Sequence, residues 1–325
     1  MIAVLVNPRS QANRRNPRVA AELQAIVGND GRVYAPKTLA ELDEVAGLFR
    51  RVAPQVIAVH GGDGTLHRAV TALGRAFGAE QIPALAILGG GTMNVVASSL
   101  GIRQRPAAFL TSLAAEARVH RPPELIRRRC MRVGSQLGFV FGNGLMANFL
   151  EEYYGTGNYG PARAAWLLLR AFFSALIGGP FVRRLFRRFE GTVRVDGVAL
   201  ERNKFVGLAA GTVREVGLGF KLVHRADDDP ERFGVIAIHA PPLALVPDFP
   251  AVHAGRGIAP RRALSAVAST LDIVPLPGQR MGYTIDGDLY HADGPLSIAV
   301  GPVIQFVRPA TALIAAGGGD TMQRR

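Results

Sequence analysis

Two glycine-rich turns, each between an apolar strand-like run and a helix-like stretch, constrain the fold of this chain more than any other feature. Val56 to Val59 runs into Gly61-Gly-Asp-Gly-Thr65, and Ala84 to Leu88 runs into Gly89-Gly-Gly-Thr92. Turns of this kind join strand to helix in βα units, whose strands form a mainly parallel sheet. The pattern predicts an α/β fold here, with both turns at one edge of the sheet.

The rest of the first hundred residues continues the same alternation. Further strands are expected at residues 2–6 and 32–34, and helices at residues 18–27, 39–51, 66–76 and 94–100. The apolar run at the N-terminus is short and has no basic residue before it. We therefore expect a first strand there and not a secretory signal.

After about residue 120 the pattern changes to short strands joined by turns, which is typical of an antiparallel, β-rich domain. The expected strands span residues 131–141, 191–198, 203–209, 235–239, 271–275, 280–285 and 296–300. With Pro122-Pro123 as the linker, we expect an α/β nucleotide-binding domain at residues 1–120 and a β-rich, sandwich-like domain at residues 121–302. A strand-like stretch from Val303 to Ala315 is expected to return to the first domain, which would then include residues 303–325.

The composition fits a folded protein with anionic partners. The 325 residues are 48% hydrophobic, which excludes global disorder, and the single cysteine excludes an internal disulfide or a Cys-rich zinc site. The formal net charge is +13, and only three of the 38 basic residues are lysines. Arginine binds phosphate through a planar fork of donors, so its excess favours phospholipid head groups, nucleotides or nucleic acid. A compositional bias explains the choice of arginine over lysine equally well, but not the positive balance.

The first turn has the residue types that phosphate binding needs. Glycines let backbone N–H groups approach phosphate oxygens, the following helix adds partial positive charge, and Thr65 is a favourable N-cap. Asp63 does not fit a simple anion cradle, because a carboxylate repels phosphates unless it binds Mg²⁺ or handles a hydroxyl proton. Its presence favours phosphoryl transfer. The alternative is an Asp-Gly turn closed by a local hydrogen bond.

The second turn fits the opposite wall of the same nucleotide cleft. Thr92 and Asn94 are also good caps for the following helix, so this turn alone is equally consistent with a structural role. The chain contains no Gly-Lys pair, which excludes a Walker A loop. The two turns together therefore carry the nucleotide hypothesis.

These motifs resemble the diacylglycerol kinase catalytic family. The resemblance rests on Asn7-Pro8, on His60 to Leu66, on Gly89 to Asn94, and on a late Ile285-Asp-Gly-Asp288 that is similar to the family's Asp-Gly-Glu motif. The family contains bacterial lipid kinases and sphingosine kinases, and it is related more distantly to NAD kinases and phosphofructokinases. The resemblance covers nearly the whole chain, and the order of the three glycine and acid motifs favours a lipid kinase.

The resemblance implies that ATP lies between the two domains. The residues that would hold it are Asn7, Thr38, Gly61, Gly62, Asp63, Gly64, Thr65, Leu66, Gly91, Thr92 and Asn94. Mg²⁺ would accompany ATP, with Asp63 as one ligand and Asp229, in the acidic loop at residues 227–231, as another. A solvated acidic loop explains Asp229 equally well.

The late motif supplies the expected catalytic base. The resemblance assigns this role to Asp288, where the family usually has the longer glutamate, with Asp286 and Asp63 as the other candidates. Such a base must reach the acceptor hydroxyl within hydrogen-bond distance. Without the resemblance, Asp286-Gly287 is typical of a two-residue β-hairpin turn, as is Asp196-Gly197.

The segment from Pro161 to Ile177 predicts one long apolar helix, and a basic run with Arg183, Arg184, Arg187 and Arg188 follows it. Arg170 and the break at Gly178-Gly-Pro180 argue against a membrane-spanning helix. The arginines favour docking on an anionic membrane surface. A core helix with a solvated basic end, or a helix that lines an acyl-chain cleft, fits the same residues.

The sequence thus predicts a two-domain enzyme, an ATP-dependent lipid kinase that phosphorylates a diacylglycerol- or sphingosine-like hydroxyl with Mg²⁺. We expect it to be cytoplasmic and peripherally associated with the inner face of the membrane, with no specific nucleic-acid partner; a homodimer stays open. The alternatives are a soluble-substrate kinase similar to NAD kinases, or a catalytically disabled protein that binds a nucleotide or nucleic acid.

Overall fold

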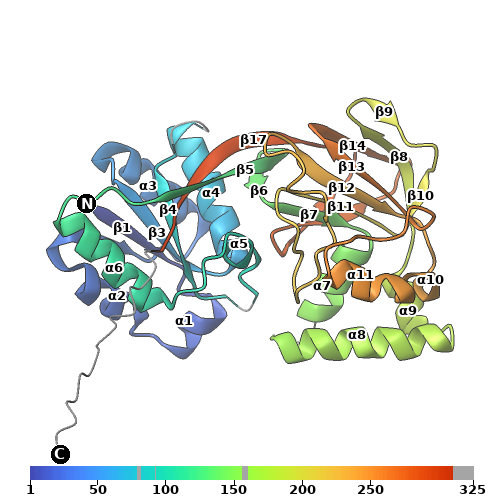
Figure 1. Cartoon of the computed structure of the whole chain (residues 1–325), viewed down its shortest axis with the longest axis horizontal. Helices are drawn as coiled ribbons and strands as arrows, with labels where there is room; N and C mark the ends of the chain where they lie inside the picture. Colours follow the sequence, from blue (N-terminus) through green and yellow to red (C-terminus); the bar gives the residue numbers. More distant parts are fainter. Residues whose placement is uncertain (79–81, 92, 156–159, 310–325) are drawn as a thin grey trace, which may run out of the picture.

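A long pair of strands joins two halves of the molecule (Figure 1). The computed structural model describes residues 1–78, 82–91, 93–155 and 160–309. One half is the expected α/β fold with a mainly parallel sheet, and the other is the expected antiparallel, β-rich fold. The joining strands are β5 (Leu125–Val133) and β17 (Leu296–Val307), which pair antiparallel along most of their length.

The α/β half is built on four parallel strands in the order β4-β3-β1-β2. These are β1 (Ile2–Val6), β2 (Gly31–Tyr34), β3 (Val56–Gly61) and β4 (Ala84–Gly89). The surrounding helices are α1 (Gln11–Arg15), α2 (Val19–Val27), α3 (Leu39–Val52), α4 (Asp63–Phe77), α5 (Val95–Ser99) and α6 (Pro106–Arg118). Both β1 and β3 are buried along their whole length, as continuous apolar runs in a parallel sheet should be.

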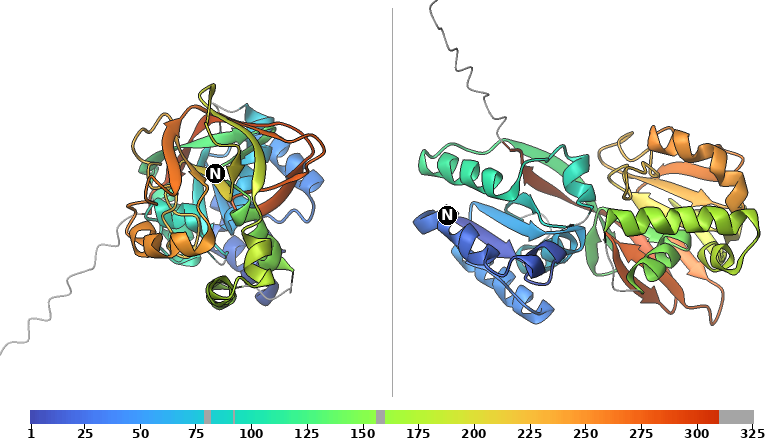
Figure 2. Two further views of the ribbon diagram at one scale, coloured as in Figure 1. Left: turned by 90° about the vertical axis from the view of Figure 1, so that its right-hand side faces the viewer. Right: turned by 90° about the horizontal axis from the view of Figure 1, so that it is seen from below.

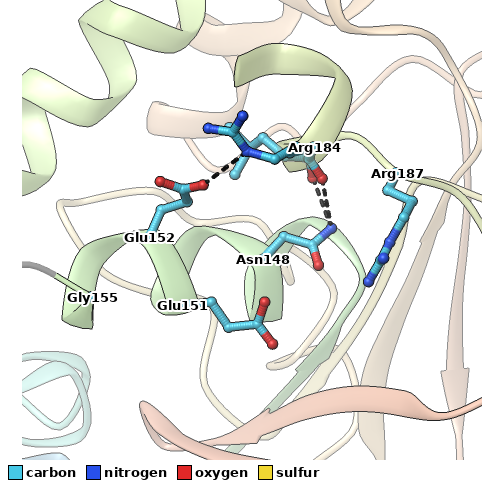
Figure 3. A pocket seen from close by; sticks show the side chains of 7 residues that line it. Asn148, Glu151, Glu152, Gly155, Arg184 and Arg187 are labelled. Atoms are coloured by element: carbon cyan, nitrogen blue, oxygen red, sulfur yellow. Dashed lines mark hydrogen bonds and ion pairs between the residues drawn. The ribbon is translucent and has the colours of Figure 1, made fainter. Parts of the chain in front are cut away.

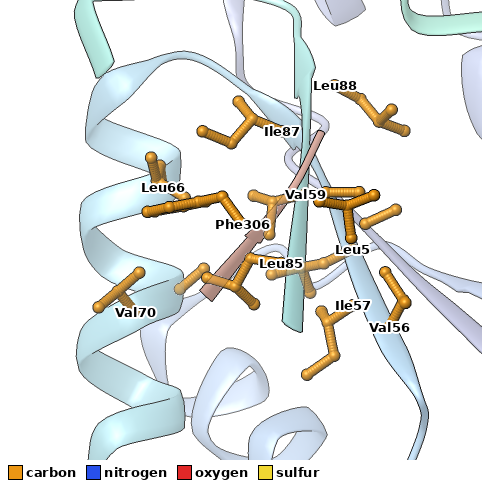
Figure 4. Close-up of a cluster of buried hydrophobic side chains, with 14 of the residues drawn as sticks. Leu5, Val56, Ile57, Val59, Leu66, Val70, Leu85, Ile87, Leu88 and Phe306 are labelled. Atoms are coloured by element: carbon orange, nitrogen blue, oxygen red, sulfur yellow. The ribbon is translucent and has the colours of Figure 1, made fainter. Parts of the chain in front are cut away.

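The core of this half lies between the sheet and its helices. Leu66 and Val70 of α4 pack with Val59 and Leu85 of the sheet, and Phe306 of β17 joins them (Figure 4). Phe306 is also the residue at which β17 pairs in parallel with Leu85 of β4. The described end of the segment from Val303 therefore lies in the N-terminal half, while Ala310 to Ala315 are outside the described residues.

The β-rich half is a sandwich of two sheets. The first sheet continues the α/β sheet through β17, with β5, β6 (Gln136–Gly138), β8 (Phe189–Val195), β9 (Val198–Ala199), β10 (Lys204–Phe205) and β14 (Thr270–Pro275). The second sheet is antiparallel and contains β7 (Val140–Asn143), β11 (Gly207–Gly211), β12 (Phe233–Ile238), β13 (Ala263–Ala268), β15 (Met281–Ile285) and β16 (Asp288–Ala292). Side chains of both sheets, such as Leu271 and Phe233, form one core between them.

Helices cover the outer side of the second sheet. They are α7 (Leu145–Tyr154), α8 (Pro161–Leu176), α9 (Pro180–Leu185), α10 (Pro242–Leu245) and α11 (Phe249–His253), with a short 3₁₀ turn at Val246–Asp248. Helix α8 confirms the predicted long helix, and it lies at the outer edge of the molecule (Figures 1 and 2). Among the described residues, no helix has the length and apolar character needed to cross a membrane.

Several local predictions were wrong. Residues 131–141 do not form one strand, because Gly134-Ser135 turns β5 back into β6 and the chain then enters the other sheet as β7. Helix α4 begins at Asp63 and not at Leu66, so its N-cap is Gly62 and Thr65 lies inside its first turn. The sequence analysis also missed α1, α6, α9, α10, α11, β13 and β16.

Candidate active site

The two glycine-rich turns pack directly against each other at the carboxyl ends of β3 and β4. The Gly90 amide donates a hydrogen bond of 2.8 Å to the Gly61 carbonyl oxygen. A Cβ atom added to Gly62 would lie 3.0 Å from the Cα of Gly91, so the two backbones touch with no room for a side chain between them. The turns therefore form one continuous surface of backbone next to the N-terminus of α4, as anion binding requires.

Asp63 joins the two turns. Its carboxylate oxygens accept hydrogen bonds from the amides of Val95, at 3.0 Å, and Val96, at 3.1 Å, which are the first residues of α5. Burial raises the pKa of Asp63 by more than these hydrogen bonds lower it, and the negative charge of Glu215 adds to the increase. The side chain is thus turned into the site and not toward bulk solvent.

Asn7 fixes the end of β1 beside the first turn. Its side-chain amide donates to the Thr65 hydroxyl at 2.8 Å, and its side-chain oxygen accepts from the Arg9 amide at 2.9 Å. On the other side, the Asn94 side chain both accepts from and donates to the backbone of Gly91, each at 3.1 Å. The structure therefore brings Asn7, Thr65, Gly91 and Asn94 together around the glycine surface.

Three residues of the expected nucleotide set have other positions or are not described. The Leu66 side chain is buried in the core, so only its backbone lies near the turn. Thr38 is the exposed N-cap of α3, where its hydroxyl accepts from the Glu41 amide at 3.1 Å. Thr92 lies outside the described residues.

The β15–β16 hairpin carries the late motif to the first turn. A Cβ atom on Gly64 would lie 2.6 Å from a carboxylate oxygen of Asp288, so this carboxylate lies against the Gly64 backbone. The guanidinium of Arg68, one turn further along α4, holds Asp288 at 2.7 Å. The first glycine-rich turn and the late motif, more than two hundred residues apart in sequence, thus meet at Gly64.

Asp286 lies deeper than Asp288. It occupies the left-handed region with φ of 47°, and its buried carboxylate accepts from the amides of Phe139 at 3.0 Å and Val140 at 2.8 Å. Burial raises the pKa of Asp286 well above its ordinary value, and the charges of Asp63 and Asp288 act in the same direction. Its hydrogen bonds anchor the hairpin to the point where the chain passes between the two sheets.

The sequence analysis missed Arg68 and the role of His67 beside it. The Nδ1 atom of His67 donates to the Leu137 carbonyl oxygen at 2.7 Å, and its Nε2 atom accepts from the Tyr290 hydroxyl at 2.8 Å. Burial lowers the pKa of His67, which keeps the ring neutral in this arrangement. Burial and the charge of Asp288 raise the pKa of Tyr290 to about 12. Two neighbouring residues of α4 thus hold two side chains of β16.

Asp229 is part of a loop whose acids bind arginines. Its carboxylate accepts from the Glu231 amide at 2.9 Å, Asp227 pairs with both Arg128 and Arg214, and Asp228 pairs with Arg225. Within the described ranges, no group of three or more His, Cys, Asp or Glu side chains is arranged to hold a metal ion. Asp229 and Asp63 instead both accept hydrogen bonds from backbone amides.

A cavity of about 430 Å³ opens between α7 and α9 (Figure 3). Charges of both signs line it, among them Glu151, Glu152, Arg184 and Arg187. The far end of α7 reaches the late motif, where the Tyr154 hydroxyl donates to the Gly287 carbonyl oxygen at 2.9 Å. Helix α7 therefore connects this polar cavity with the hairpin that carries Asp288.

The sequence of the α/β half matches a known family model. Residues 1–121 match the model of the diacylglycerol kinase catalytic domain. The resemblance predicted from the motifs is therefore confirmed for these residues. The diacylglycerol kinase catalytic domain contains both glycine-rich turns, whereas Asp286 and Asp288 lie beyond the matched residues.

Solved structures show the same fold over nearly the whole chain. A diacylglycerol kinase from Bacillus anthracis strain Sterne is 17% identical, with a TM-score of 0.62, and the match covers 95% of this chain and 97% of that one. A proposed diacylglycerol kinase from the same strain is 16% identical, with a TM-score of 0.66 and the same coverage. The α/β half and the β-rich half thus belong to a known arrangement. No curated protein matches the chain in sequence.

Proposed function

We propose that this protein is a lipid kinase that transfers the γ-phosphate of ATP to the hydroxyl group of a lipid. The observation that carries the proposal is the contact between Asp288 and Gly64, which brings a carboxylate to the glycine surface of a diacylglycerol kinase catalytic domain. A nucleotide-storage site has no use for an acid beside its phosphates, whereas an alcohol acceptor needs a group that takes its proton.

The glycine surface is the proposed site of the triphosphate. The N-terminus of α4 favours negative charge, and the close contact of Gly62 with Gly91 keeps side chains out of the space. Asn7 and Thr65 provide polar side chains at its edge. Magnesium enters in this proposal only with its substrate, as the MgATP complex.

Asp288 is the proposed base. The acceptor oxygen forms a bond to the γ-phosphorus, the bond from that phosphorus to the bridging oxygen breaks, and ADP leaves with the electron pair. The hydroxyl proton passes to the Asp288 carboxylate, which Arg68 holds in position. Asp286 lies behind it with both carboxylate oxygens bonded to backbone amides, so its proposed role is to position the hairpin.

Two observations support a lipid as the acceptor. The solved relatives with the same two-half fold are named as diacylglycerol kinases. In addition, a long helix with exposed apolar side chains lies on the half that follows the kinase domain. A diacylglycerol- or sphingosine-like lipid is therefore favoured over NAD.

The test is transfer of labelled phosphate from MgATP by the purified chain. The acceptors are diacylglycerol, monoacylglycerol and sphingosine in mixed micelles, and NAD in solution, each assayed separately. We expect a labelled lipid; label in NAD alone would contradict the proposal. Asp63→Ala and Asp288→Ala should each lower kcat at least about a hundredfold, whereas Asp43→Ala, which breaks a surface pair with Arg75, should not. Unchanged transfer by Asp288→Ala would refute its role as the base, and unchanged transfer by Asp63→Ala would show that transfer does not need the bonds by which Asp63 joins the two turns.

A further inference from the structure

Helix α8 presents apolar side chains on two sides. Its inner side is buried through Ala164, Leu167 and Ala171, which pack with α7 and α9. Its outer side carries a stripe that is between 47% and 84% exposed: Trp166, Leu169, Phe173, Leu176 and Ile177. A surface helix normally has polar residues on its outer side, and contiguous exposed apolar residues mark an interaction site. We call this stripe the α8 face; helix α8 lies in front in the right-hand view of Figure 2.

An apolar groove continues the α8 face at its C-terminal end. A cavity of about 490 Å³ lies between the ends of α8, α9 and α10, and its lining includes Val182, Phe186, Pro242 and Leu243. Leu243 is itself an exposed residue. The apolar surface therefore extends beyond one helix and crosses to α10.

The surroundings of the α8 face are strongly basic. Residues 161–188 contain six arginines and no acidic residue. The Arg170 guanidinium lies 5.4 Å from the ring centre of Trp166 and 4.2 Å from that of Phe181, while Arg183, Arg187 and Arg188 are exposed. Arg184 differs from these, because it pairs with Glu152. Guanidinium groups beside apolar and aromatic side chains fit the phosphate layer and the adjoining acyl chains of a bilayer.

We propose that the α8 face docks the protein on an anionic membrane surface. Its apolar side chains would enter the boundary between head groups and acyl chains, and the flanking arginines would contact lipid phosphates. A second copy of the chain fits this face less well, because two such basic surfaces repel each other. Docking goes beyond the proposed reaction, since binding to a membrane requires neither ATP nor phosphate transfer.

Packing connects the α8 face with the glycine surface. The cluster beneath α8 includes Met93, which follows the second glycine-rich turn, and Leu218. A Cβ atom on Gly217 would lie 2.9 Å from the Met93 sulfur, so the loop after β11 lies against the same residue. Helix α8, which is about 10 Å across, and the cluster beneath it separate the α8 face from Met93. Docking through α8 therefore brings the proposed transfer site close to the membrane in which a lipid acceptor lies.

Vesicle sedimentation of the full chain without nucleotide tests the proposal. The vesicles contain phosphatidylcholine alone, or phosphatidylcholine and phosphatidylglycerol in equal amounts. We expect binding to the anionic vesicles that falls at least about tenfold in Leu169→Glu/Leu176→Glu, because charge on the stripe opposes insertion. Replacing Arg183, Arg187 and Arg188 together by Ser should weaken it about a hundredfold. The control Val198→Glu, at an exposed valine of β9, should bind as the wild type does.

Each other outcome overturns the proposal. Unchanged binding by Leu169→Glu/Leu176→Glu, or an equal loss in Val198→Glu, would show that the α8 face does not dock. Light scattering that finds a wild-type dimer, a monomeric Leu169→Glu/Leu176→Glu variant and no vesicle binding would assign the face to a second copy. Unfolding curves verify that the variants fold. Phosphate transfer to a short-chain diacylglycerol in solution separates the docking proposal from the proposed function. Leu169→Glu/Leu176→Glu should keep this activity. If the wild type transfers no phosphate but still binds anionic vesicles, the proposed function fails and the docking proposal stands.

Discussion

Two Asp-Gly turns in this chain share one backbone conformation. Asp196-Gly197 joins β8 to β9, and Asp286-Gly287 joins β15 to β16, each as a two-residue hairpin loop. The φ angles are 48° and 80° in the first turn and 47° and 87° in the second. Two positive φ angles in a two-residue loop are typical of a type I′ turn, which Asp-Gly favours. The dipeptide alone therefore predicts the backbone of both.

The surroundings of the two carboxylates differ. Asp196 is partly exposed, accepts from the amides of Ser269 and Thr270 at 2.8 Å each, and pairs with Arg232. Its partial burial raises the pKa, but these hydrogen bonds and the arginine outweigh it, so the pKa of Asp196 is lowered. Asp286 has two amide donors but lies buried near the negative Asp63, and its pKa is raised. The same turn thus makes a surface anchor in one sheet and part of the candidate site in the other.

The largest difference should appear when each carboxylate is removed. Asp286→Ala leaves the buried amides of Phe139 and Val140 without acceptors and places Ala at positive φ, which should cost about 3 kcal/mol of unfolding free energy. Asp196→Ala exposes its amide partners to water and should cost about 1 kcal/mol. Urea unfolding measures both. Asp286→Asn keeps an acceptor and tolerates positive φ, so it is the matched control; equal losses in the two Ala variants would break the comparison.

The pH dependence of stability should have opposite signs at the two turns. Asp286 has a raised pKa when folded, so its contribution is fully present below its ordinary pKa of 3.8 and is lost as the pH rises through the folded value. Asp196 has a lowered pKa, so its contribution is present above 3.8 and is lost as the pH falls. One proton gives a slope of at most about 1.4 kcal/mol per pH unit.

Unfolding free energies of three proteins across the acid range measure these slopes. Relative to the wild type, Asp286→Asn should gain stability as the pH rises above 3.8, and Asp196→Asn should lose stability as the pH rises toward 3.8. Slopes of the same sign in the two variants would show that burial does not separate the two carboxylates.

The glycines of the two turns should respond alike. Gly197→Ala and Gly287→Ala each place a Cβ atom at a positive φ, at a cost of about 1 kcal/mol. Neither site adds a clash: nothing lies within 4 Å of the new atom at Gly197, and at Gly287 the Tyr154 hydroxyl is 3.8 Å away. Equal losses in urea unfolding would show that the turns share their backbone energetics. A much larger loss at Gly287 would mean that the surroundings also control the backbone.

The sequence predicts those parts of the fold that neighbouring residues determine. The apolar run 2–6 became β1, and the helix expected from Leu39 follows the Thr38 cap. Residues 131–141 were misjudged as one strand because the Gly134-Ser135 hairpin turn, with φ of 58° at Gly134, was not recognised. The second break depends on distant partners, as Met131 pairs with Val300 in one sheet and Phe141 with Ala210 in the other.

The candidate site likewise combines features that neighbouring residues determine with contacts between residues far apart in sequence. Glycines beside Asp63 are a local signal, and the sequence was sufficient to place both turns at one sheet edge. The ion pair of Arg68 with Asp288 joins residues 220 positions apart, and the hydrogen bond of His67 with Tyr290 spans 223 positions. No local pattern encodes such contacts. The partners of Asp63, Val95 and Val96, are likewise set by how the two turns pack.

The arginines beside the two hairpins should give the smallest effect. Arg232 pairs with Asp196, and Arg68 pairs with Asp288 in the strand after the second turn. The arginine side chains are 38% and 48% exposed, and exposed pairs contribute less than about 1 kcal/mol to stability. Urea unfolding of Arg232→Met and Arg68→Met should therefore show similar, small losses.

Activity should separate these two variants where stability does not. Without Arg68, the Asp288 carboxylate is no longer held against Gly64, so kcat for labelled lipid should fall about threefold, which is less than 1 kcal/mol in the barrier. Arg232→Met should keep wild-type activity, because its partner Asp196 lies on a hairpin of the other sheet. Equal activity in both variants would mean that the hairpin alone positions Asp288. The difference between the two turns would then come from the burial of Asp286 and not from the arginine beside it.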